Sequence, residues 1–377
     1  MKRVLTFVCI VAVMAGLLAA CGSGDVTINV NVKPGKLADG FEWDDYYSEI
    51  IITGYSGDSN DLKVPDTING KPVTIIAKKA FKNFTSLVSI ALPKELKTIG
   101  EEAFCGCTSL TEITIPESVT KIEAYAFGEC DNLKKINWNA IHCENDYEIF
   151  SKYQAIGPDA SIVIGDKVES LGEPFQYVGM TQIVIPDSVK SIGDCCFWGC
   201  DKLESIHIGA GCTSVGDIYR LAGTLKTVTV SNGNPAYCVI NNCLIEKNSK
   251  KIILGLPDCK IPTDGSVTSI GDHAFYNNKV LTEFIIPEGV TSIGDNAFYS
   301  CTNLSVLTVP KTLTDAGYKP FDYCLALKTV YYSGTKNEWN NNRMKTVLFG
   351  GYYGIGSGEP IINTVHCSDG VIDLSWY

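Results

Sequence analysis

Apolar residues recur along this chain at a fixed spacing of 23 residues. The repeating block reads Ile-Gly-x-x-Ala-Phe-x-x-Cys-x-x-Leu-x-x-Ile-x-Ile-Pro-x-x-Val and is almost undisturbed from Ile99 to Val119. Such a unit cannot bury its apolar face alone, so copies of it must stack on one another. The pattern therefore predicts a solenoid. Its phenylalanine falls in two groups spaced by 23 residues: Phe81, Phe104 and Phe127, then Phe275, Phe298 and Phe321.

Each repeat predicts two short strands and a turn. Apolar and polar residues alternate from Leu110 to Pro116, as in a strand with one buried face. Pro116 ends this strand because proline cannot donate the next ladder hydrogen bond. Residues 119–122 predict a second short strand, and the Ala-Phe-x-x-Cys segment predicts one turn of α- or 3₁₀-helix. The Ile, Phe, Cys and Leu side chains of the block are expected to point inward and to stack from coil to coil in one continuous column.

The predicted fold is a mainly β solenoid of 23-residue coils, with N- and C-terminal caps. The 23-residue spacing is interrupted by an irregular coil at 139–165. A hairpin-like insertion at 231–262 turns at Asn241 and Asn242. Strands of the Leu-x-x-Ile-x-Ile type are expected to begin at Leu87, Leu110, Leu133, Met180, Leu203, Leu225, Leu281, Leu304 and Leu327.

The N-terminus has the pattern of an export signal. Lys2 and Arg3 precede an apolar run that is too short to span a bilayer and ends in Leu-Ala-Ala before Cys21. This step resembles a bacterial lipobox, in which the cysteine becomes the acylated first residue, and several acyl chains make a stable anchor. An ordinary cleaved signal, or a retained N-terminal helix, with a chance cysteine is the alternative. We expect a signal at 1–20, a tether at 21–40 and the solenoid with its caps at 41–377.

Composition and charge narrow the possible partners. The formal net charge is −11, and no cluster of Lys and Arg occurs, which argues against nucleic acid and against docking on anionic lipid. A hydrophobic fraction of 45% with 35 glycines is typical of a packed, turn-rich chain. Membrane association is therefore expected only through the lipid anchor.

The repeats resemble the BspA-like, treponemal-type leucine-rich-repeat family of bacterial surface proteins. The resemblance covers about residues 41–367 and includes Ile68-Asn-Gly-Lys-Pro72 and Val330-Tyr-Tyr-Ser-Gly-Thr-Lys-Asn-Glu-Trp339. It implies a leucine-rich-repeat-like arc with short helical turns, outside the cytoplasm, used for adhesion or for binding host or bacterial macromolecules. It implies no enzyme and no cofactor. It carries no ligand motif that maps onto residues here.

The sixteen cysteines are interpreted mainly as packing residues. Five of them share one repeat position, where Phe84 and Asn278 substitute for cysteine in other copies. A buried cysteine behaves as a small hydrophobe, and stacked side chains run parallel, so thiols are favoured over bridges between adjacent coils. One bridge is considered within the insertion, which contains Cys238, Cys243 and Cys259. The five are Cys107, Cys130, Cys200, Cys301 and Cys324.

The sequence shows no recognisable pattern of catalytic or metal-binding residues. The four histidines are scattered and lie near no Ser or Cys in a nucleophile pattern, and the cysteine spacings do not match zinc sites. An acid recurs after Ile-Gly. Stacked acids could gather Ca²⁺, but capping of a one-turn helix is favoured. These acids are Glu101, Asp194, Asp217, Asp272 and Asp295, with Glu123 in a related step.

The candidate binding surface is the solvent side of the main strands. The central exposed position is small, β-branched or mixed in charge, which suits a flat contact with a macromolecule; ordinary solvent-facing strand residues are the alternative. These residues are Thr114, Asn137, Val184, His207, Thr229, Ile285, Thr308 and Tyr331. The rival function is glycan capture on an aromatic platform near the C-terminus, although these aromatics would also suit a cap. They are Tyr331, Tyr332, Trp339, Phe349, Tyr352 and Tyr353.

Overall fold

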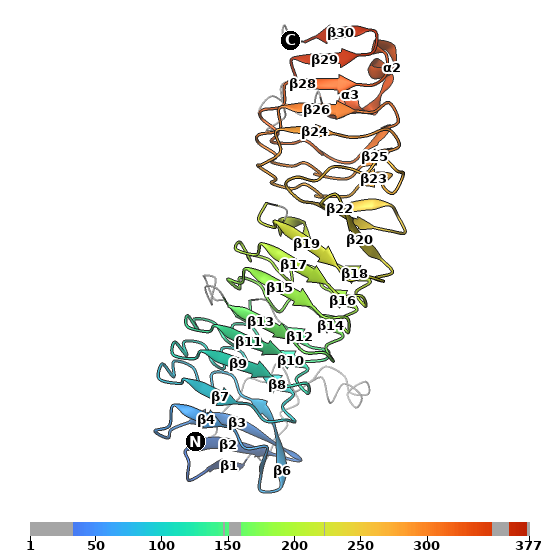
Figure 1. Cartoon of the computed structure of the whole chain (residues 1–377). Coiled ribbons are helices and arrows are strands. Elements are labelled where there is room, and N and C mark those ends of the chain that lie inside the picture. Colours follow the sequence, from blue (N-terminus) through green and yellow to red (C-terminus); the bar gives the residue numbers. More distant parts are fainter. Residues whose placement is uncertain (1–32, 146–147, 151–159, 222, 349–361, 375–377) are drawn as a thin grey trace, which may run out of the picture.

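The computed structural model describes residues 33–145, 148–150, 160–221, 223–348 and 362–374. The expected signal, the lipid-anchor residue Cys21 and most of the tether lie outside these residues. The described chain is an elongated stack of coils with its two ends at opposite ends of the stack (Figure 1). Within the described ranges, no helix has both the length and the apolar character needed to cross a bilayer.

The main strands run parallel along one side of the stack. All nine predicted main strands are confirmed, and each begins two residues after its predicted start. Equivalent repeat positions pair in register, for example Ile113 with Ile136 and Ile136 with Ile162. The main strands are β4 (Asp61–Lys63), β7 (Ser89–Ala91), β9 (Glu112–Ile115), β11 (Lys135–Trp138), β13 (Ser161–Ile164), β15 (Gln182–Ile185), β17 (Ser205–Ile208), β19 (Thr227–Val230), β24 (Glu283–Ile285), β26 (Val306–Val309), β28 (Thr329–Tyr332) and β29 (Thr364–Cys367).

A second column of shorter strands forms another side of each coil. The stretch predicted at 119–122 is β10 (Lys121–Ile122), which pairs in parallel with the strands of both neighbouring coils. The others are β6 (Lys71–Ile76), β8 (Thr98–Ile99), β12 (Glu144–Asn145), β14 (Ser170–Leu171), β16 (Ser191–Ile192), β18 (Ser214–Val215), β22 (Lys251–Gly255), β23 (Ser269–Ile270), β25 (Ser292–Ile293) and β27 (Asp315–Ala316).

The third side of the coil differs from the prediction, because the Ala-Phe-x-x-Cys segment is a series of tight turns and not a helical turn. The Phe104 N–H donates to Ala126 O of the next coil at 2.7 Å, whereas the Cys105 N–H donates within its own turn to Glu102 O at 3.2 Å. Glu102 adopts φ of 54°, which interrupts a helix. Alternate N–H groups thus bind the neighbouring coil. A 3₁₀-helix, η1 (Ile218–Leu221), lies just before the insertion.

The inward side chains stack as predicted within each half of the molecule. Phe104 lies 5.1 Å from Phe81 and 5.2 Å from Phe127, with the rings nearly parallel. The stack continues to Phe150, whose ring centroid is 5.4 Å from that of Phe127. Phe150 was not predicted to join the stack because it lies in the irregular stretch 139–165, although it also follows Phe127 by 23 residues. Phe275, Phe298 and Phe321 form a second stack.

The insertion divides the core, so the expectation of one continuous column of apolar side chains is wrong. β20 (Tyr237–Ile240), β21 (Cys243–Glu246) and β22 form an antiparallel meander. Asn241 and Asn242 both have positive φ at its predicted turn. Leu244 packs in the N-terminal core, whereas Ile245 packs in the C-terminal core. Successive residues of a strand face opposite ways, so a strand laid across the stack closes both cores.

The two ends of the stack are capped. At the N-terminus, β1 (Lys33–Lys36), β2 (Phe41–Tyr46) and β3 (Glu49–Tyr55) are antiparallel, β3 joins β6, and β5 (Thr67–Ile68) also pairs with β6. β1 lies within the stretch expected to be a tether. At the C-terminus, β30 (Gly370–Asp373) pairs with β29. Helices α2 (Lys336–Asn341) and α3 (Arg343–Leu348) cover the last coils.

Candidate functional site

The eight predicted surface residues lie at equivalent positions on the main strands, in three rows. The parallel register places each one directly beside its equivalent in the next strand. The first two rows are neighbours because β13 lies beside β15, and the insertion stands between the second and third rows. The rows are Thr114, Asn137 and Val163; Val184, His207 and Thr229; and Ile285, Thr308, Tyr331 and His366.

The sequence analysis missed two members of these rows. Val163 belongs to β13, in the stretch treated as irregular, although the alternation in Ser-Ile-Val-Ile from Ser161 would have indicated a strand. His366 belongs to β29, and its ring stacks on Tyr331 with centroids 4.7 Å apart. A long connection separates β28 from β29 in the sequence. Their pairing therefore cannot be predicted from the 23-residue spacing.

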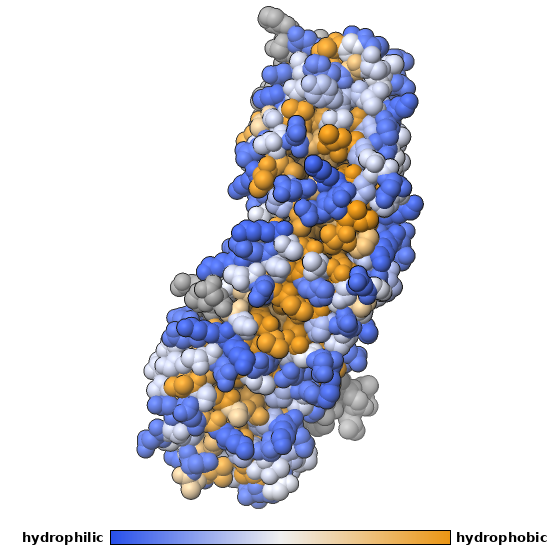
Figure 2. All heavy atoms as spheres, in the orientation of Figure 1, coloured by the Kyte–Doolittle hydropathy of each residue, from blue (hydrophilic) through white to orange (hydrophobic). Residues whose placement is uncertain are grey.

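Several side chains of this face are apolar and exposed. Val163 is 50% exposed, Val184 is 60% exposed and Ile285 is 65% exposed. Figure 2 shows hydrophobic surface as a broken band along the length of the solenoid, with polar residues along both edges. Exposed apolar patches bordered by polar residues are typical of interaction sites.

A hydrogen-bonded chain of four side chains crosses the middle row. His207 Nδ1 lies 2.8 Å from Thr229 Oγ1, and His207 Nε2 lies 3.0 Å from Ser231 Oγ. Ser231 donates to Asp187 Oδ1 at 3.2 Å, and the Ala210 N–H donates to the same oxygen at 2.5 Å. The Ala210 N–H, and after it the Ser231 hydroxyl, hold the pKa of Asp187 below its usual value. The four side chains therefore fix one another's orientation.

This chain of contacts places His207 beside Ser231, a proximity that the scattered positions of the histidines in the sequence do not indicate. Its order nevertheless differs from that of an activated nucleophile, in which the acid orients the histidine and the histidine takes the serine proton. Here Asp187 accepts the hydrogen of Ser231, and Thr229 occupies the other nitrogen of His207. The arrangement orders a surface and does not make Ser231 a stronger nucleophile. Over the described ranges, no group of three or more His, Cys, Asp or Glu residues is placed to hold a metal ion.

The recurrent acids do bind backbone N–H groups, but in neighbouring coils and not in a helix of their own. Asp272 accepts from the Asp295 N–H at 2.7 Å, and Asp295 accepts from the Tyr318 N–H at 2.5 Å. Asp194 accepts from the Asp217 N–H at 3.3 Å. The predicted helix cap is therefore wrong, because the turns leave their N–H groups directed along the stack. We call these contacts the acid ladder.

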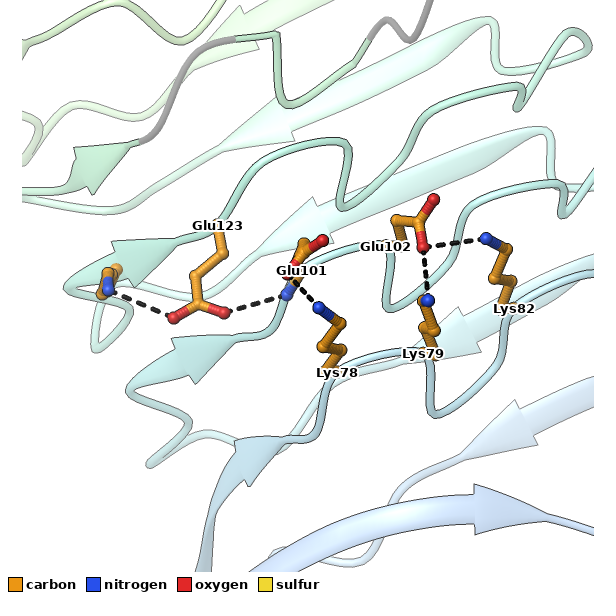
Figure 3. Close-up of polar contacts among 7 residues, drawn as sticks. Lys78, Lys79, Lys82, Glu101, Glu102 and Glu123 are labelled. Carbon is orange, nitrogen blue, oxygen red and sulfur yellow. Dashed lines mark hydrogen bonds and ion pairs between the residues drawn. The ribbon is translucent and has the colours of Figure 1, made fainter. Parts of the chain in front are cut away.

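The N-terminal coils add ion pairs across the same joints (Figure 3). Glu102 lies 3.2 Å from Lys79 Nζ and 2.8 Å from Lys82 Nζ of the preceding coil. Glu101 pairs with Lys78, and its N–H donates to Glu123 at 3.0 Å. These charges face one another across adjacent coils. They join side chains of adjacent coils.

Two of the three described aromatic residues of the predicted C-terminal platform are buried and cannot form an exposed surface. Trp339 is 1% exposed and Tyr332 is 4% exposed, with ring centroids 5.1 Å apart. Thr335 and Glu338 form a capping box that begins α2 and directs Trp339 into the core. Only Tyr331 of the described candidates remains largely exposed. Phe349, Tyr352 and Tyr353 lie outside the described residues.

Comparison with known proteins identifies the repeat. The family model described as "BspA type Leucine rich repeat region" matches residues 74–174, 171–234 and 236–346, with six copies. A leucine-rich repeat protein from Eubacterium ventriosum is 22% identical, with 80% of this chain and 72% of that chain covered and a TM-score of 0.50, which supports the solenoid fold.

Two further solved structures are similar. A leucine rich cell surface protein from Faecalibacterium prausnitzii is 23% identical, with 82% of this chain and 97% of that chain covered and a TM-score of 0.48. The pneumococcal vaccine antigen PcpA is 16% identical, with 80% and 82% covered and a TM-score of 0.49. No curated protein matches the chain.

Proposed function

This chain belongs to the BspA-type leucine-rich-repeat family, and from that premise we propose that it is an extracytoplasmic bacterial binding protein. Its main parallel sheet contacts a host or bacterial surface protein. The observation that carries this proposal is the in-register face on which Val163 and Val184 stand exposed beside the ordered His207 side chain. An apolar centre with a polar rim is the usual composition of a protein contact.

Polar side chains on this face and beside it are already arranged in pairs. Lys226 lies 2.6 Å from Glu204, and Asn137 donates to Thr114 at 2.9 Å. Such cross-strand pairs hold these side chains in place and limit the side-chain entropy lost on binding. A long, ordered face of this kind suits a protein partner better than a small ligand, which needs a concave site.

Attachment to the membrane is part of the same proposal. Cys21 follows Leu-Ala-Ala after a short apolar run and would carry the lipid. The Cys21→Ala variant is expected to move from the membrane fraction to the soluble fraction and to lose labelling by a fatty-acid analogue. Unchanged membrane association of this variant would remove the lipid anchor from the proposal while leaving the binding face intact.

The binding face is tested by placing a charge at its centre. We expect Val184→Lys to weaken binding to a panel of immobilised host extracellular-matrix proteins by about tenfold or more, because the ammonium group cannot be desolvated there. Val280→Lys is the matched control, since Val280 is also 60% exposed but lies before β24 and outside the main strands. Binding that survives Val184→Lys, or that the control weakens equally, contradicts the proposed face.

A further inference from the structure

A cavity of about 230 Å³ lies where the insertion interrupts the stack. It is lined by residues of β18 and η1 on the N-terminal side and of β22 and the turn after β23 on the C-terminal side. Figure 1 shows β18, β22 and β23 on the opposite edge of the molecule from β15, β17 and β19. The cavity is therefore separate from the proposed binding face. We call it the junction cavity.

The junction cavity occupies the place of a missing rung of the acid ladder. Asp194 accepts the Asp217 N–H, and Asp272 accepts the Asp295 N–H, so both carboxylates are fixed at the cavity wall. Asp217 is the next acid in the ladder, but the insertion replaces the coil that would supply its N–H. Among the described residues, no group donates a hydrogen bond to the Asp217 carboxylate, which lines the cavity. It is available to a ligand.

One aromatic ring at the cavity is held in place by its neighbours. The Tyr219 ring stacks on His273 with centroids 4.2 Å apart and meets Tyr276 edge-on at 5.8 Å. Tyr276 in turn stacks on Tyr299 at 5.2 Å. The row continues along the turns of the C-terminal coils. Packing of this kind fixes the orientation of Tyr219 before any ligand arrives, which lowers the entropic cost of binding.

The lining combines three kinds of group. The carboxylates of Asp194, Asp217 and Asp272 accept hydrogen bonds, and the Lys251 ammonium group donates them. Val215 and Ile253 add apolar surface beside Tyr219. Three carboxylates against one ammonium group repel an anion. A purely apolar ligand would desolvate these charges without replacing their hydrogen bonds.

We propose that the junction cavity binds a neutral saccharide. The hydroxyl hydrogens of a pyranose suit the carboxylates, its hydroxyl oxygens suit Lys251, and the C–H groups of the ring suit the apolar surface and Tyr219. The volume accommodates about one sugar residue, so a longer chain would extend out of the cavity. This inference goes beyond the proposed protein-binding face and does not depend on it.

The test uses the chain without its signal, biotinylated and tetramerised on streptavidin to raise avidity, on an array of neutral, sialylated and sulfated glycans. We expect retention of neutral glycans, with the signal reduced about tenfold or more in Asp217→Asn and in Tyr219→Ala. The matched controls Asp201→Asn and Tyr318→Ala change the same residue types at exposed positions outside the cavity. They should retain the signal, as should Val184→Lys.

Three results would overturn the proposal: absence of neutral-glycan binding, binding of anionic glycans alone, or equal signals from the cavity variants and the controls. Melting temperatures of all variants separate loss of binding from loss of folding. Asp217→Asn keeps the test decisive even if Tyr219→Ala disturbs packing, because Asp217 is exposed and its carboxylate accepts no hydrogen bond from the described residues. Loss of protein binding in Val184→Lys with glycan binding retained would show that the two faces act separately.

Discussion

The Cys107 thiol donates a hydrogen bond to the Phe81 carbonyl oxygen, 3.2 Å away in the preceding coil. The same contact recurs at the other four cysteines of this repeat position, at distances of 3.0 to 3.3 Å. None of the five forms a disulfide. The repeat cysteine is thus more than a small apolar filler, because its S–H group gives a second hydrogen bond to a carbonyl that already accepts an N–H within its own turn, as Phe81 O does from the Phe84 N–H at 3.1 Å.

Burial makes these thiols resistant to ionisation. It raises the pKa of Cys107 from about 9 to about 12, and that of Cys200 similarly. Since the unfolded chain ionises first, the stability that these thiols contribute is complete below pH 9 and falls as the pH rises from 9 to 12. We expect the free energy of unfolding to fall less steeply over this range in Cys107→Ala, measured by urea denaturation.

Native thiols should also react slowly. Iodoacetamide at pH 8 is expected to label Cys107 only after denaturation, because the thiolate is the reactive form. Mass spectrometry of peptides from native and denatured protein provides the measurement. Rapid labelling of Cys107 in the native protein would contradict the buried position.

Trp339 is predicted to contribute to stability and not to an exposed platform. Trp339→Ala should lower the free energy of unfolding by about 3–5 kcal/mol, because it removes a buried indole ring from the last coil. Tyr331→Ala is the matched control, since Tyr331 is 46% exposed, and it should change stability much less. Equal effects of the two substitutions on urea denaturation would argue against the C-terminal cap described above.

The disulfide between Cys243 and Cys259 should stabilise the junction of the two cores. It confirms the single bridge considered for the insertion, and it closes a loop with a sequence separation of 16 residues. Loss of a constraint of this size is expected to cost about 3 kcal/mol. We predict a lower melting temperature for the double variant Cys243→Ser, Cys259→Ser by calorimetry. A melting temperature equal to that of the native protein would show that the meander holds without the bridge.

Asp187 should make the stability of the middle row sensitive to acid. Its folded pKa lies below the usual value of 3.8, so the stability it contributes is present above that value and is lost as the pH falls through the folded pKa. Melting temperatures of the native protein and Asp187→Asn should therefore differ at pH 6, and the difference should shrink as the pH falls below 3.8. Asp201→Asn is the control, and a difference that does not shrink on acidification would contradict this account.

Much of the fold follows from the repeat because every copy meets the same environment. The position of Phe104 in the block is enough to place Phe81 and Phe127 in the core, since each packs against equivalents of itself. The same logic placed the exposed residues Val184 and Ile285 on the outside of their strands. The role of these exposed residues in binding remains our proposal, because a periodic pattern specifies which way a side chain points and not what it meets.

The amino-acid sequence by itself determined the period, the main strands and the inward side chains, because these depend on spacing within one repeat. Only the tertiary structure decided the contacts that join one coil to the next. Asp272 binds the Asp295 N–H, and His207 meets Ser231, because stacking brings residues of different coils within hydrogen-bond distance. The tertiary structure also decided that the insertion divides the core, with Leu244 in the N-terminal half and Ile245 in the C-terminal half. A strand laid across the stack offers one face to each half, and no spacing along the chain specifies where that strand will lie.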